Sequence, residues 1–537
     1  MLARVQSYLL QGIDALPCEV EVDFEEGGID KQRATVVGLP DSAVKESIER
    51  VRSALGNSGY YFPLGRILVN LAPADVRKEG PLYDLPIALG LLMNIGVIRT
   101  LAARKPPSGA GGATATATAT ATVPQGLDLR KLVIAGELAL DGRLRPVRGA
   151  IAMAALAKQR GAEGVILPAE NAAEAAVVEG VNCYPARTLV EVVGLLTGQL
   201  EPVPFPPVDV AGLLESATVP IDFADVRGQE GVKRAITVAA AGMHNLVMLG
   251  PAGTGKTMMA RALPGVLPAL STDEAIEITR IFSAAGQLSP GKGLITLRPV
   301  RTPHHTASAA AIVGGGAVPK PGEISLAHHG VLFMDELPEF PRDVLETLRQ
   351  PLEDHVVTIA RSHSAVRFPA DFMLVAAMNP TPKGDMANDE FSRREMDRYL
   401  ARLSGPLIDR IDIHVEAPAV PWKQLSAGLA AAGPRGTSSA EMRAKVLAAR
   451  TRQAARQGLG LINARLSGRQ LDKLAPLTET ARAILGQAMA ELGLSARAYD
   501  KVRRVSRTIA DLEGSDEITD AHVAEAIQYR LLDRKRV

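Results

Sequence analysis

Cysteine is scarce in this sequence, and the scarcity excludes two kinds of architecture. The two cysteines, Cys18 and Cys183, lie far apart and form no CxxC pair. A disulfide framework needs more cysteines than this, and a thiolate zinc site needs cysteines at close spacing. We therefore expect two buried, reduced thiols in a cytoplasmic protein.

Long apolar runs are missing as well. The longest one, residues 85–98, is interrupted by Pro86 and Asn94, and it falls short of the ~20 residues that a membrane-spanning helix needs. The first twelve residues have no sustained apolar stretch and no small-residue cleavage site, so we expect no signal peptide. The run predicts a core helix, and no membrane partner is expected.

An excess of charge of one sign is the third absence. The chain has 60 Lys and Arg residues against 59 Asp and Glu residues, a formal net charge of +1. A nucleic-acid partner would therefore have to be met by local basic patches. The 537 residues, 47% of them hydrophobic, are too many for one ordinary core and predict several globular domains.

Two changes of composition divide the chain. Residues 104–126 begin with Pro and Gly and continue as an Ala-Thr repeat, which predicts a flexible insertion within one domain. The proline-rich segment 198–212 is the better domain boundary. Hydrophobic periodicity predicts a mixed N-terminal domain, a linker, an α/β core and a helical C-terminal domain, at residues 1–200, 201–219, 220–420 and 437–537.

The segment 246–263 combines an apolar strand, a glycine-rich loop and the start of a helix. The loop matches the phosphate-binding pattern G-x-x-x-x-G-K-[ST]. Its residues are Gly250, Pro251, Ala252, Gly253, Thr254, Gly255, Lys256 and Thr257. In such a loop backbone N–H groups cradle the phosphates, the lysine reaches the terminal phosphates, and the threonine hydroxyl helps to hold Mg²⁺. We therefore predict that the protein binds ATP with Mg²⁺.

Two further apolar strands end in polar residues that suit hydrolysis. Residues 330–336 end in Asp335 and Glu336, and residues 371–378 are followed by Asn379. We expect Asp335 to reach the Mg²⁺ shell and Glu336 to polarise the attacking water, which Asn379 would orient. At each position an ordinary surface turn is the alternative.

Arg410 lies between a predicted helix and a predicted strand, in the segment GPLIDRIDIHVE. An arginine at such an edge can stabilise transition-state charge in the site of a neighbouring subunit. The alternative is a salt-bridged surface arginine. If Arg410 acts on a neighbour, the protein works as a ring.

Together these motifs resemble an AAA+ ATPase. The segment 298–340, with RTPHHTASAAAIVGGG and GVLFMDELPEF, is similar to the magnesium-chelatase-like AAA+ family and, within it, to the ComM/YifB type of competence-associated ATPase. The segments VVGLPDSAVKESIERVRSALG, GELALDGRLRPVRGAI and LSARAYDKVRRVSRTIADLEG extend the resemblance over nearly the whole chain. The resemblance implies a parallel-sheet α/β core, a Lon-protease-like α+β N-terminal domain and a C-terminal helical lid.

The resemblance also implies roles for single residues. Asn379 would be the sensor-1 residue, Arg410 the arginine finger, and Arg497 the sensor-2 arginine of the lid, with Arg503 and Arg504 as alternatives to Arg497. The family is implied to form hexameric rings, and its ComM-type members to act in branch migration of DNA during natural transformation.

The sequence departs from related sequences at two places, and these departures argue against peptidase activity and against bound zinc. A Lon-type peptidase needs a serine activated by a lysine, but Leu82 follows Gly80 and Pro81 where the serine is expected, and residues 141–150 contain no lysine. Relatives often carry a cysteine cluster after the sensor-1 asparagine, whereas residues 381–400 contain none. We expect neither peptidase activity nor bound zinc. The histidine pairs at 304–305 and 328–329 are expected to have structural or nucleotide-neighbour roles.

Candidate DNA contacts lie on two segments. Strand-forming residues flank ARSHSA, which predicts a hairpin with Arg361, His363 and Arg367 near its tip or flanks. Arg298 and Arg301 lie on a second predicted insertion. Phosphate contact by these side chains would engage a DNA strand in the ring's pore, and a brace for the ring is the alternative.

The sequence therefore predicts a cytoplasmic, Mg²⁺-dependent ATP hydrolase that forms a homo-oligomer, with hexamers implied by the resemblance, and that moves single-stranded or branched DNA. A chelatase-type motor or a protein-remodelling ATPase is the alternative, and DNA dependence of ATP hydrolysis would separate these classes.

Overall fold

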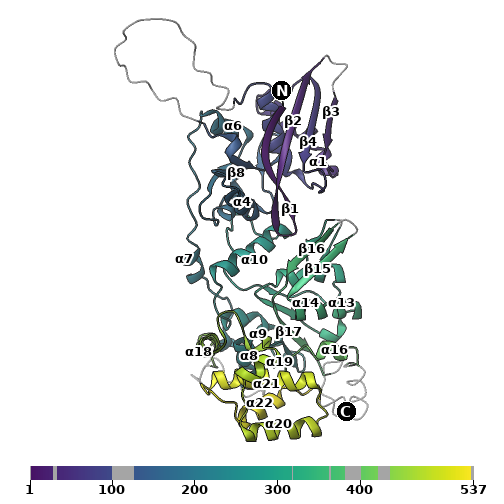
Figure 1. The fold of residues 1–537 in the computed structure, drawn as a ribbon, viewed down its shortest axis with the longest axis vertical. Helices are drawn as coiled ribbons and strands as arrows, with labels where there is room; N and C mark the ends of the chain where they lie inside the picture. Colours follow the sequence, from purple (N-terminus) through teal and green to yellow (C-terminus); the bar gives the residue numbers. More distant parts are fainter. Residues whose placement is uncertain are drawn as a thin grey trace, which may run out of the picture. The chain divides into compact units, whose positions relative to one another are not determined.

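The computed structural model describes residues 2–27, 33–99, 126–316, 318–361, 364–380, 399, 401–420 and 436–533. The chain forms two compact units, coloured along the sequence in Figure 1. The first contains Met1–Leu213 and Ala275–Ile295, and the second contains Leu214–Glu274 and Thr296–Val537. Most of helix α10 (Thr272–Ala285) is thus counted with the N-terminal part of the chain, although it follows the phosphate-binding loop in sequence.

The first unit is built on two sheets and a short hairpin. The four-stranded sheet has the order β1-β2-β4-β3, in which only the β3–β4 pair is parallel. The three-stranded sheet is parallel, in the order β5-β8-β9. The strands, including the β6–β7 hairpin, are β1 (Leu2–Gln11), β2 (Asp14–Glu26), β3 (Arg33–Val37), β4 (Gly65–Ala72), β5 (Leu132–Ile134), β6 (Glu137–Leu138), β7 (Leu144–Arg145), β8 (Gly164–Pro168) and β9 (Asn182–Ala186).

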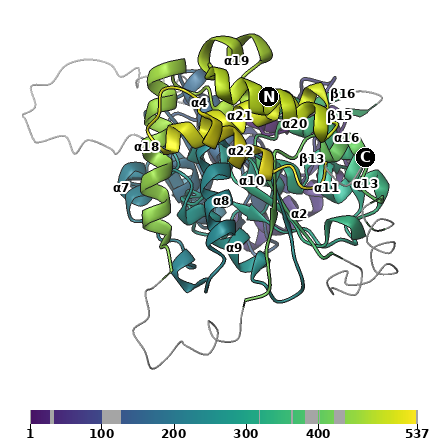
Figure 2. The same ribbon diagram turned by 90° about the horizontal axis from the view of Figure 1, so that it is seen from below.

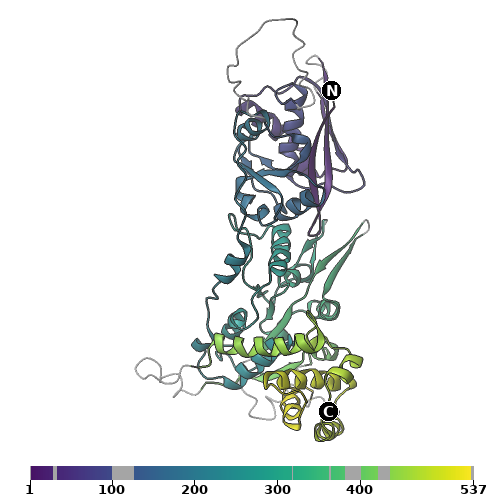
Figure 3. The ribbon, with the colours of Figure 1, turned by 60° about the vertical axis from the view of Figure 1, so that its left-hand side comes forward.

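Apolar helices cover one face of the four-stranded sheet (Figure 3). Strand β2 alternates, with Cys18, Val20 and Val22 buried and the acidic residues between them facing outward, as expected for a sheet with one solvated face. Helix α3 (Asp84–Asn94), the predicted core helix, packs on β1 and β2, and its residues 84–92 are all buried. The other helices are α1 (Ser42–Lys45), α2 (Ser47–Asn57), α4 (Ala150–Gln159), α5 (Ala172–Ala175) and α6 (Leu189–Thr197).

The second unit contains a five-stranded parallel sheet in the order β11-β14-β17-β10-β18. Its strands are β10 (Leu246–Leu249), β11 (Val300–Arg301), β14 (Val331–Met334), β17 (Met373–Met378) and β18 (Ile413–Glu416). The three central strands are apolar and buried at every position, which is typical of a parallel sheet covered on both faces. Because the strands are parallel, the segments that follow them meet at one edge of the sheet, here called the carboxyl edge.

Helices and two hairpins complete this core. The hairpins are formed by β12 (Gly314–Gly315) with β13 (Lys320–Pro321), and by β15 (Val356–Arg361) with β16 (Ser364–Pro369). The helices are α8 (Glu230–Gly242), α9 (Lys256–Ala262), α11 (Ala309–Val313), α12 (Glu323–Leu326), α13 (Arg342–Thr347), α14 (Arg349–Asp354) and α16 (Gly405–Ile408). Helix α7 (Val210–Glu215) spans the boundary between the two units and buries no residue.

The C-terminal region is helical (Figure 2). Its helices are α18 (Ser439–Gln457), α19 (Gly468–Leu474), α20 (Glu479–Glu491), α21 (Ala496–Leu512) and α22 (Asp520–Gln528). Helix α21 begins at a Ser495 cap, whose side chain accepts a hydrogen bond from the backbone N–H of Ala498, and it packs against α8, α18 and α22. The lid helices and the α/β core therefore share one hydrophobic core.

The predicted α/β core with a parallel sheet, the mixed N-terminal sheet and the helical C-terminal region are confirmed. Cys18 and Cys183 are both buried and unpaired, as expected. None of the helices in the described part of the chain combines the length and apolar character needed to cross a membrane. Residues 104–125 of the Ala-Thr insertion, His363 and the segment 381–398 that replaces the cysteine cluster lie outside the described residues.

Candidate nucleotide site

The phosphate-binding loop joins β10 to α9 at the carboxyl edge of the sheet. Gly253 and Gly255 have positive φ angles of 79° and 84°, and an added Cβ at either would enter open space. At Gly250 an added Cβ would lie 2.1 Å from the carbonyl oxygen of Ala417, so only glycine fits there. The loop is thus an open backbone cradle at a helix N-terminus, which fits a phosphate chain.

Lys256 and Asn379 come together inside this cradle. The Lys256 ammonium donates to the carbonyl oxygens of Gly250 (2.7 Å) and Pro251 (2.8 Å) and to Oδ1 of Asn379 (3.2 Å). Burial lowers the pKa of Lys256, although the nearby carboxylates of Asp335 and Glu336 act in the opposite direction. The ammonium is therefore held beside the loop by two backbone carbonyl groups and one side-chain amide. A phosphate group can replace these acceptors or share the ammonium with them.

Thr257 and Asp335, the residues expected to hold Mg²⁺, lie side by side and are hydrogen-bonded. The Thr257 hydroxyl donates to Oδ2 of Asp335 over 2.8 Å, and the other oxygen of this carboxylate accepts from the backbone N–H of Glu336. A hydroxyl and a carboxylate beside a phosphate cradle are hard oxygen ligands of the kind that Mg²⁺ takes together with substrate phosphates. These residues fit Mg²⁺ bound with a nucleotide.

Glu336 occupies a strained backbone position next to Asp335. Its φ angle is +53°, a left-handed conformation that is unusual for a residue with a side chain, and such strain concentrates at functional sites. Oε2 of Glu336 lies 3.3 Å from Nδ1 of His305, which follows the neighbouring strand β11. The carboxylate is half exposed and is therefore accessible to water.

Arg410 lies at the opposite, amino edge of the sheet. Its carbonyl oxygen accepts from Nδ2 of Asn245, the residue immediately before β10, whereas the phosphate-binding loop immediately follows β10. A four-residue strand separates the two positions by about 13 Å. The guanidinium of Arg410 donates to the carbonyl oxygen of Pro406 (2.6 Å) and to the carboxylate of Glu353. Arg410 therefore faces away from the phosphate-binding loop of its own chain.

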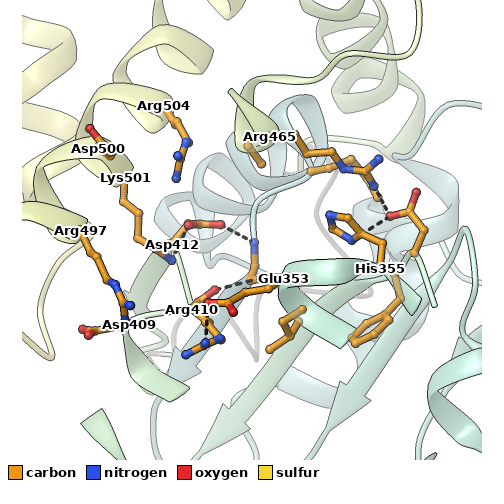
Figure 4. A pocket seen from close by; sticks show the side chains of 16 residues that line it. Glu353, His355, Asp409, Arg410, Asp412, Arg465, Arg497, Asp500, Lys501 and Arg504 are labelled. Carbon is orange, nitrogen blue, oxygen red and sulfur yellow. Dashed lines mark hydrogen bonds and ion pairs between the residues drawn. The ribbon is translucent and has the colours of Figure 1, made fainter. Parts of the chain in front are cut away.

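A cavity of about 550 Å³ opens beside Arg410, between the core and the lid (Figure 4). Its basic lining residues are Arg410, Arg465, Arg497, Lys501, Arg504 and His355. The sequence alone left Arg497, Arg503 and Arg504 open for the sensor-2 role. Arg503 is paired with Asp472 (2.8 Å), and Arg504 donates to the carbonyl oxygen of Leu466 (2.7 Å). Arg497 is exposed and makes no hydrogen bond or ion pair with the described residues.

The structure thus brings Arg497 together with Arg410 at the amino edge. The loop residues 250–257 do not line this cavity. The sensor-2 role that the resemblance implies for Arg497 stays a prediction, and at the amino edge it would concern a nucleotide bound by a neighbouring chain. Helix α21 packs on α8, and the N-terminal part of α21 lies at the amino edge of the sheet, where β10 begins.

A buried charged network forms the wall of the cavity. The Lys501 ammonium lies 2.7 Å from Oδ1 of Asp412, and Oδ2 of Asp412 accepts from the backbone N–H of Asn245. Burial raises the pKa of Asp412, but Lys501 and His244 outweigh burial and hold that pKa well below its ordinary value. His244 is fully buried and bonded to Thr508 of α21. These contacts join the lid to the strand edge that carries Arg410.

The two predicted DNA contacts on the second insertion are occupied within the chain. Arg298 donates to the carbonyl oxygens of Pro268 (2.7 Å) and His329 (2.7 Å) and is paired with Glu274 (2.9 Å). Arg301 makes a two-point ion pair with Glu323, at 2.6 and 2.8 Å. A guanidinium engaged in this way braces the fold, so the geometry argues against both residues as DNA contacts.

The predicted hairpin is confirmed and is formed by β15 and β16. Arg361 pairs with Ser364 at the last described position before the tip, and Arg367 pairs with Thr358 on the exposed face. The alternate positions Val357, Ile359, Val366 and Phe368 are buried. Arg367 makes no hydrogen bond or ion pair with the described residues. Of the candidate DNA contacts with described side chains, only Arg367 is exposed and unpaired.

Sequence reasoning missed three parts of this site. His305 was noted only as one of two adjacent histidines, because nothing in the spacing predicts its 3.3 Å approach to Glu336. The roles of Glu353 and Lys501 leave no local pattern in the sequence. Glu353 pairs with Arg410, 57 positions away, and Lys501 pairs with Asp412, 89 positions away. Two arginines of the basic helix α18 are engaged within the chain, because Arg443 and Arg450 donate to backbone carbonyl oxygens of the core.

Family comparisons match all three parts of the chain. The family described as magnesium chelatase, subunit ChlI, matches residues 222–425, and the family described as its C-terminal part matches residues 436–530. A further family, described as subunit ChlI of Mg-chelatase, matches residues 20–105 and 113–171. The matches leave residues 106–112, within the insertion, and residues 172–221, which include the linker, uncovered. Their extent agrees with the resemblance inferred from the motifs.

Full-length relatives are similar over the whole chain. The competence protein ComM of Haemophilus influenzae is 43% identical over 99% of this chain and 98% of its own length. The uncharacterized protein YifB of Escherichia coli is 42% identical over 99% and 98%. The magnesium-chelatase 38 kDa subunit of Cereibacter sphaeroides is 24% identical over 30% of this chain. The chain therefore belongs to the magnesium-chelatase ChlI-like family of AAA ATPases, with ComM and YifB as full-length relatives.

Proposed function

We propose that the protein is a ring-shaped, Mg²⁺-dependent ATPase that moves branched or single-stranded DNA, as a branch-migration motor in recombination during natural transformation. The observation that carries the proposal is that the candidate hydrolysis residues lie in two groups, at opposite edges of the sheet. Lys256, Thr257, Asp335, Glu336 and Asn379 lie at the carboxyl edge, and Arg410 and Arg497 converge at the amino edge.

The division supports a ring. A phosphoryl-transfer site that draws an arginine from another subunit is incomplete in a single chain. Head-to-tail contact between identical chains places the amino edge of one against the carboxyl edge of the next, and such a contact closes when the rotation allows. In this arrangement Arg410 and Arg497 face the terminal phosphates bound by the neighbour, and ring size follows from the closing angle.

DNA as the moved substrate is supported by one surface and one relative. The β15–β16 hairpin presents the exposed, unpaired Arg367 beside the small residues Ala360 and Ala365. A positive charge on a narrow, sterically open ribbon suits phosphate contact without base specificity. The full-length similarity to a protein named for competence favours a role in handling DNA.

A synthetic four-way DNA junction tests the whole proposal. With ATP and Mg²⁺ the wild-type protein should separate the labelled junction into duplex arms, whereas Lys256→Ala and Glu336→Gln variants should not. Junction resolution by the wild type alone would establish an ATP-driven DNA motor. ATP hydrolysis that is indifferent to DNA, with intact junctions, would overturn the proposal in favour of a protein-remodelling ATPase.

The hairpin is tested separately through the salt dependence of DNA binding. Arg367→Ala should weaken binding and lower the slope of log affinity against log salt by about one, as expected for one lost phosphate contact. Arg482→Ala is the matched control, because Arg482 is also exposed and unpaired among the described residues but lies on α20. Equal slopes in Arg367→Ala and the wild type would remove the hairpin from the DNA contacts.

A further inference from the structure

We infer that a pocket on the N-terminal unit binds an acidic peptide segment of a partner protein, one that carries apolar side chains beside its acidic ones. The inference is independent of ATP hydrolysis and of the proposed DNA substrate. The pocket has a volume of about 300 Å³, at the lower end of the range for ligand sites. It lies between the β6–β7 hairpin, the segment after β8 and the segment after β9, and its charged lining residues are Arg143, Arg145, Glu170 and Arg187.

The pocket wall formed by the hairpin has a fixed backbone. The N–H of Leu144 donates to the carbonyl oxygen of Arg187 (2.8 Å), and the N–H of Leu189 donates to that of Gly142 (2.9 Å), so the segment after β9 lies beside β7. Gly142 has a φ angle of +83°, and an added Cβ there would lie 2.2 Å from Oγ of Ser58, which follows α2. Because the hairpin is held from both sides, the side chains that line the pocket start from fixed positions.

Two opposite charges on the pocket walls have no partner. Arg187 and Glu170 are both exposed, and neither side chain makes a hydrogen bond or ion pair with the described residues, including with the other. Opposite charges that line one cavity without pairing leave room for a ligand between them. A peptide carboxylate can accept two parallel N–H groups from the arginine, and a peptide N–H can donate to the glutamate.

The other two arginines of the pocket bring counter-charges of their own. Nε of Arg143 lies 2.7 Å from Oδ2 of Asp141, and Arg145 lies 3.3 Å from Oε1 of Glu137. With Glu170 included, each of the three arginines is matched by an acidic residue. Binding of a nucleic-acid backbone depends on an excess of positive charge. The pocket lacks that excess, so a segment of mixed chemistry suits it better than a polyphosphate.

Exposed apolar side chains flank the pocket. Leu140, next to the lining residue Ala139, is 57% exposed, and Val190, three residues after Arg187, is 49% exposed. The carbonyl oxygen of Leu140 accepts from Nδ2 of Asn57 (2.7 Å), so this turn is tied to α2 while its side chain stays uncovered. Covering such side chains stabilises a complex in proportion to the apolar area removed from water. The partner segment therefore needs apolar residues next to its acidic ones.

Fluorescence anisotropy of the full chain tests the inference, with a set of labelled hexapeptides in which Asp or Glu alternates with Leu or Phe. Members of the set should bind with a Kd on the order of 10–100 µM, whereas the same peptides with Asn or Gln in place of the acids should not. Arg187→Ala should weaken binding by about tenfold or more, because a charge-assisted hydrogen bond is lost. Leu140→Ser should weaken it by about three- to tenfold.

Arg160→Ala is the matched control for Arg187→Ala. Arg160 is also exposed and unpaired among the described residues of the same unit, but it does not line the pocket. The melting temperature of Arg187→Ala should equal that of the wild type, because this guanidinium holds no contact with the described residues. A loss of binding then reports on the pocket and not on the fold.

Three results would overturn the inference. One is the absence of binding by every peptide of the set up to about 1 mM, and another is equal affinity in Arg187→Ala and the wild type. The third is a larger loss for a single-stranded DNA oligonucleotide than for the peptides in Arg187→Ala, which would assign the pocket to DNA. A wild type that binds the peptides but leaves the four-way junction intact overturns only the proposed DNA function.

Discussion

The carboxyl and amino edges of the five-stranded sheet carry charged groups that are held in different ways. At the carboxyl edge, Lys256 donates to a carbonyl oxygen of the phosphate-binding loop. Thr257 donates to the carboxylate of Asp335, which follows β14. At the amino edge, Arg497 is exposed and Arg410 is tied to a half-exposed Glu353. The first edge carries the phosphate-binding loop, whereas the second has a cavity lined by both basic and acidic side chains and by no residue of that loop.

This difference teaches how the chain divides its chemistry. A phosphate cradle needs consecutive backbone N–H groups, which one loop supplies locally. Charge stabilisation of the transition state needs a cation that arrives from outside the cradle. In the proposed function the candidates for that cation are Arg410, which precedes β18, and Arg497 on α21.

The largest expected effect is on hydrolysis when Arg410 is replaced. Arg410→Ala should lower ATP turnover by about 10³- to 10⁵-fold, the range found for arginine fingers, while nucleotide binding stays intact. Lys256→Ala should inactivate the phosphate-binding site at the carboxyl edge. A mixture of the two inactive variants should recover part of the activity, because mixed rings contain interfaces with both intact edges. No recovery in the mixture would contradict a site shared between subunits.

The next largest effect is on stability. Lys501→Met leaves the buried Asp412 carboxylate without its cation, and breaking a buried pair in this way costs about 3–5 kcal/mol. Denaturant unfolding of the full chain should show this loss, whereas Lys473→Met, an exposed change on α19, should leave the free energy of unfolding nearly unchanged. Similar values for the two variants would mean that the lid is not anchored through Asp412.

Stability should also fall when the pH is lowered from about 7.5 to 5. Burial lowers the pKa of His244, against the opposing effect of Asp412, and burial lowers that of His414 well below its ordinary value. The unfolded chain therefore binds protons below about pH 6.5 that the folded chain does not, so the free energy of unfolding decreases as the pH falls. Asp412, whose folded pKa is depressed, adds a further loss near and below its unfolded pKa of about 3.9.

The melting temperature measured across this range checks the prediction. His414→Gln removes one of the two buried imidazole rings. The melting temperature should then fall less steeply between pH 7 and 5, because unfolding takes up as much as one proton fewer. A melting temperature that is constant over the same range would show that these rings are protonated in the folded chain.

The smallest effect is expected at Glu353. Glu353→Gln removes the charge that holds Arg410, but Glu353 is half exposed, and such pairs contribute about 0–1 kcal/mol. ATP turnover of assembled protein should change by less than about fivefold, and in the direction of faster turnover because Arg410 is freer to reach a phosphate. A loss as large as that of Arg410→Ala would instead make Glu353 part of the hydrolysis site.

Local motifs explain what was predictable. The loop 250–257, the strand ends at Asp335 and Asn379, the core helix α3 and the β15–β16 hairpin all follow from composition and periodicity within short windows. Each depends on the conformations of neighbouring residues, which hydrophobic period, glycine and strand-forming side chains restrict. The resemblance to the ChlI-like family, later confirmed, was carried by the same short windows.

The remaining features depend on strand order and long-range packing. Arg298 looked like a surface cation in sequence, but the fold surrounds it with three carbonyl oxygens and Glu274. The resemblance implied only a sensor-2 role for Arg497, and it is the packing of α21 on α8 that places this residue beside Arg410.

The sequence by itself determined that the chain folds as an α/β core with a helical C-terminal region and carries an ATP-binding loop with its acidic partners. Backbone geometry and side-chain chemistry within a few residues are enough for that. The tertiary structure alone decided which edge each arginine occupies and that His305 meets Glu336. Those positions depend on the order β11-β14-β17-β10-β18, because contacts between distant segments arise only when the strands that carry them become neighbours.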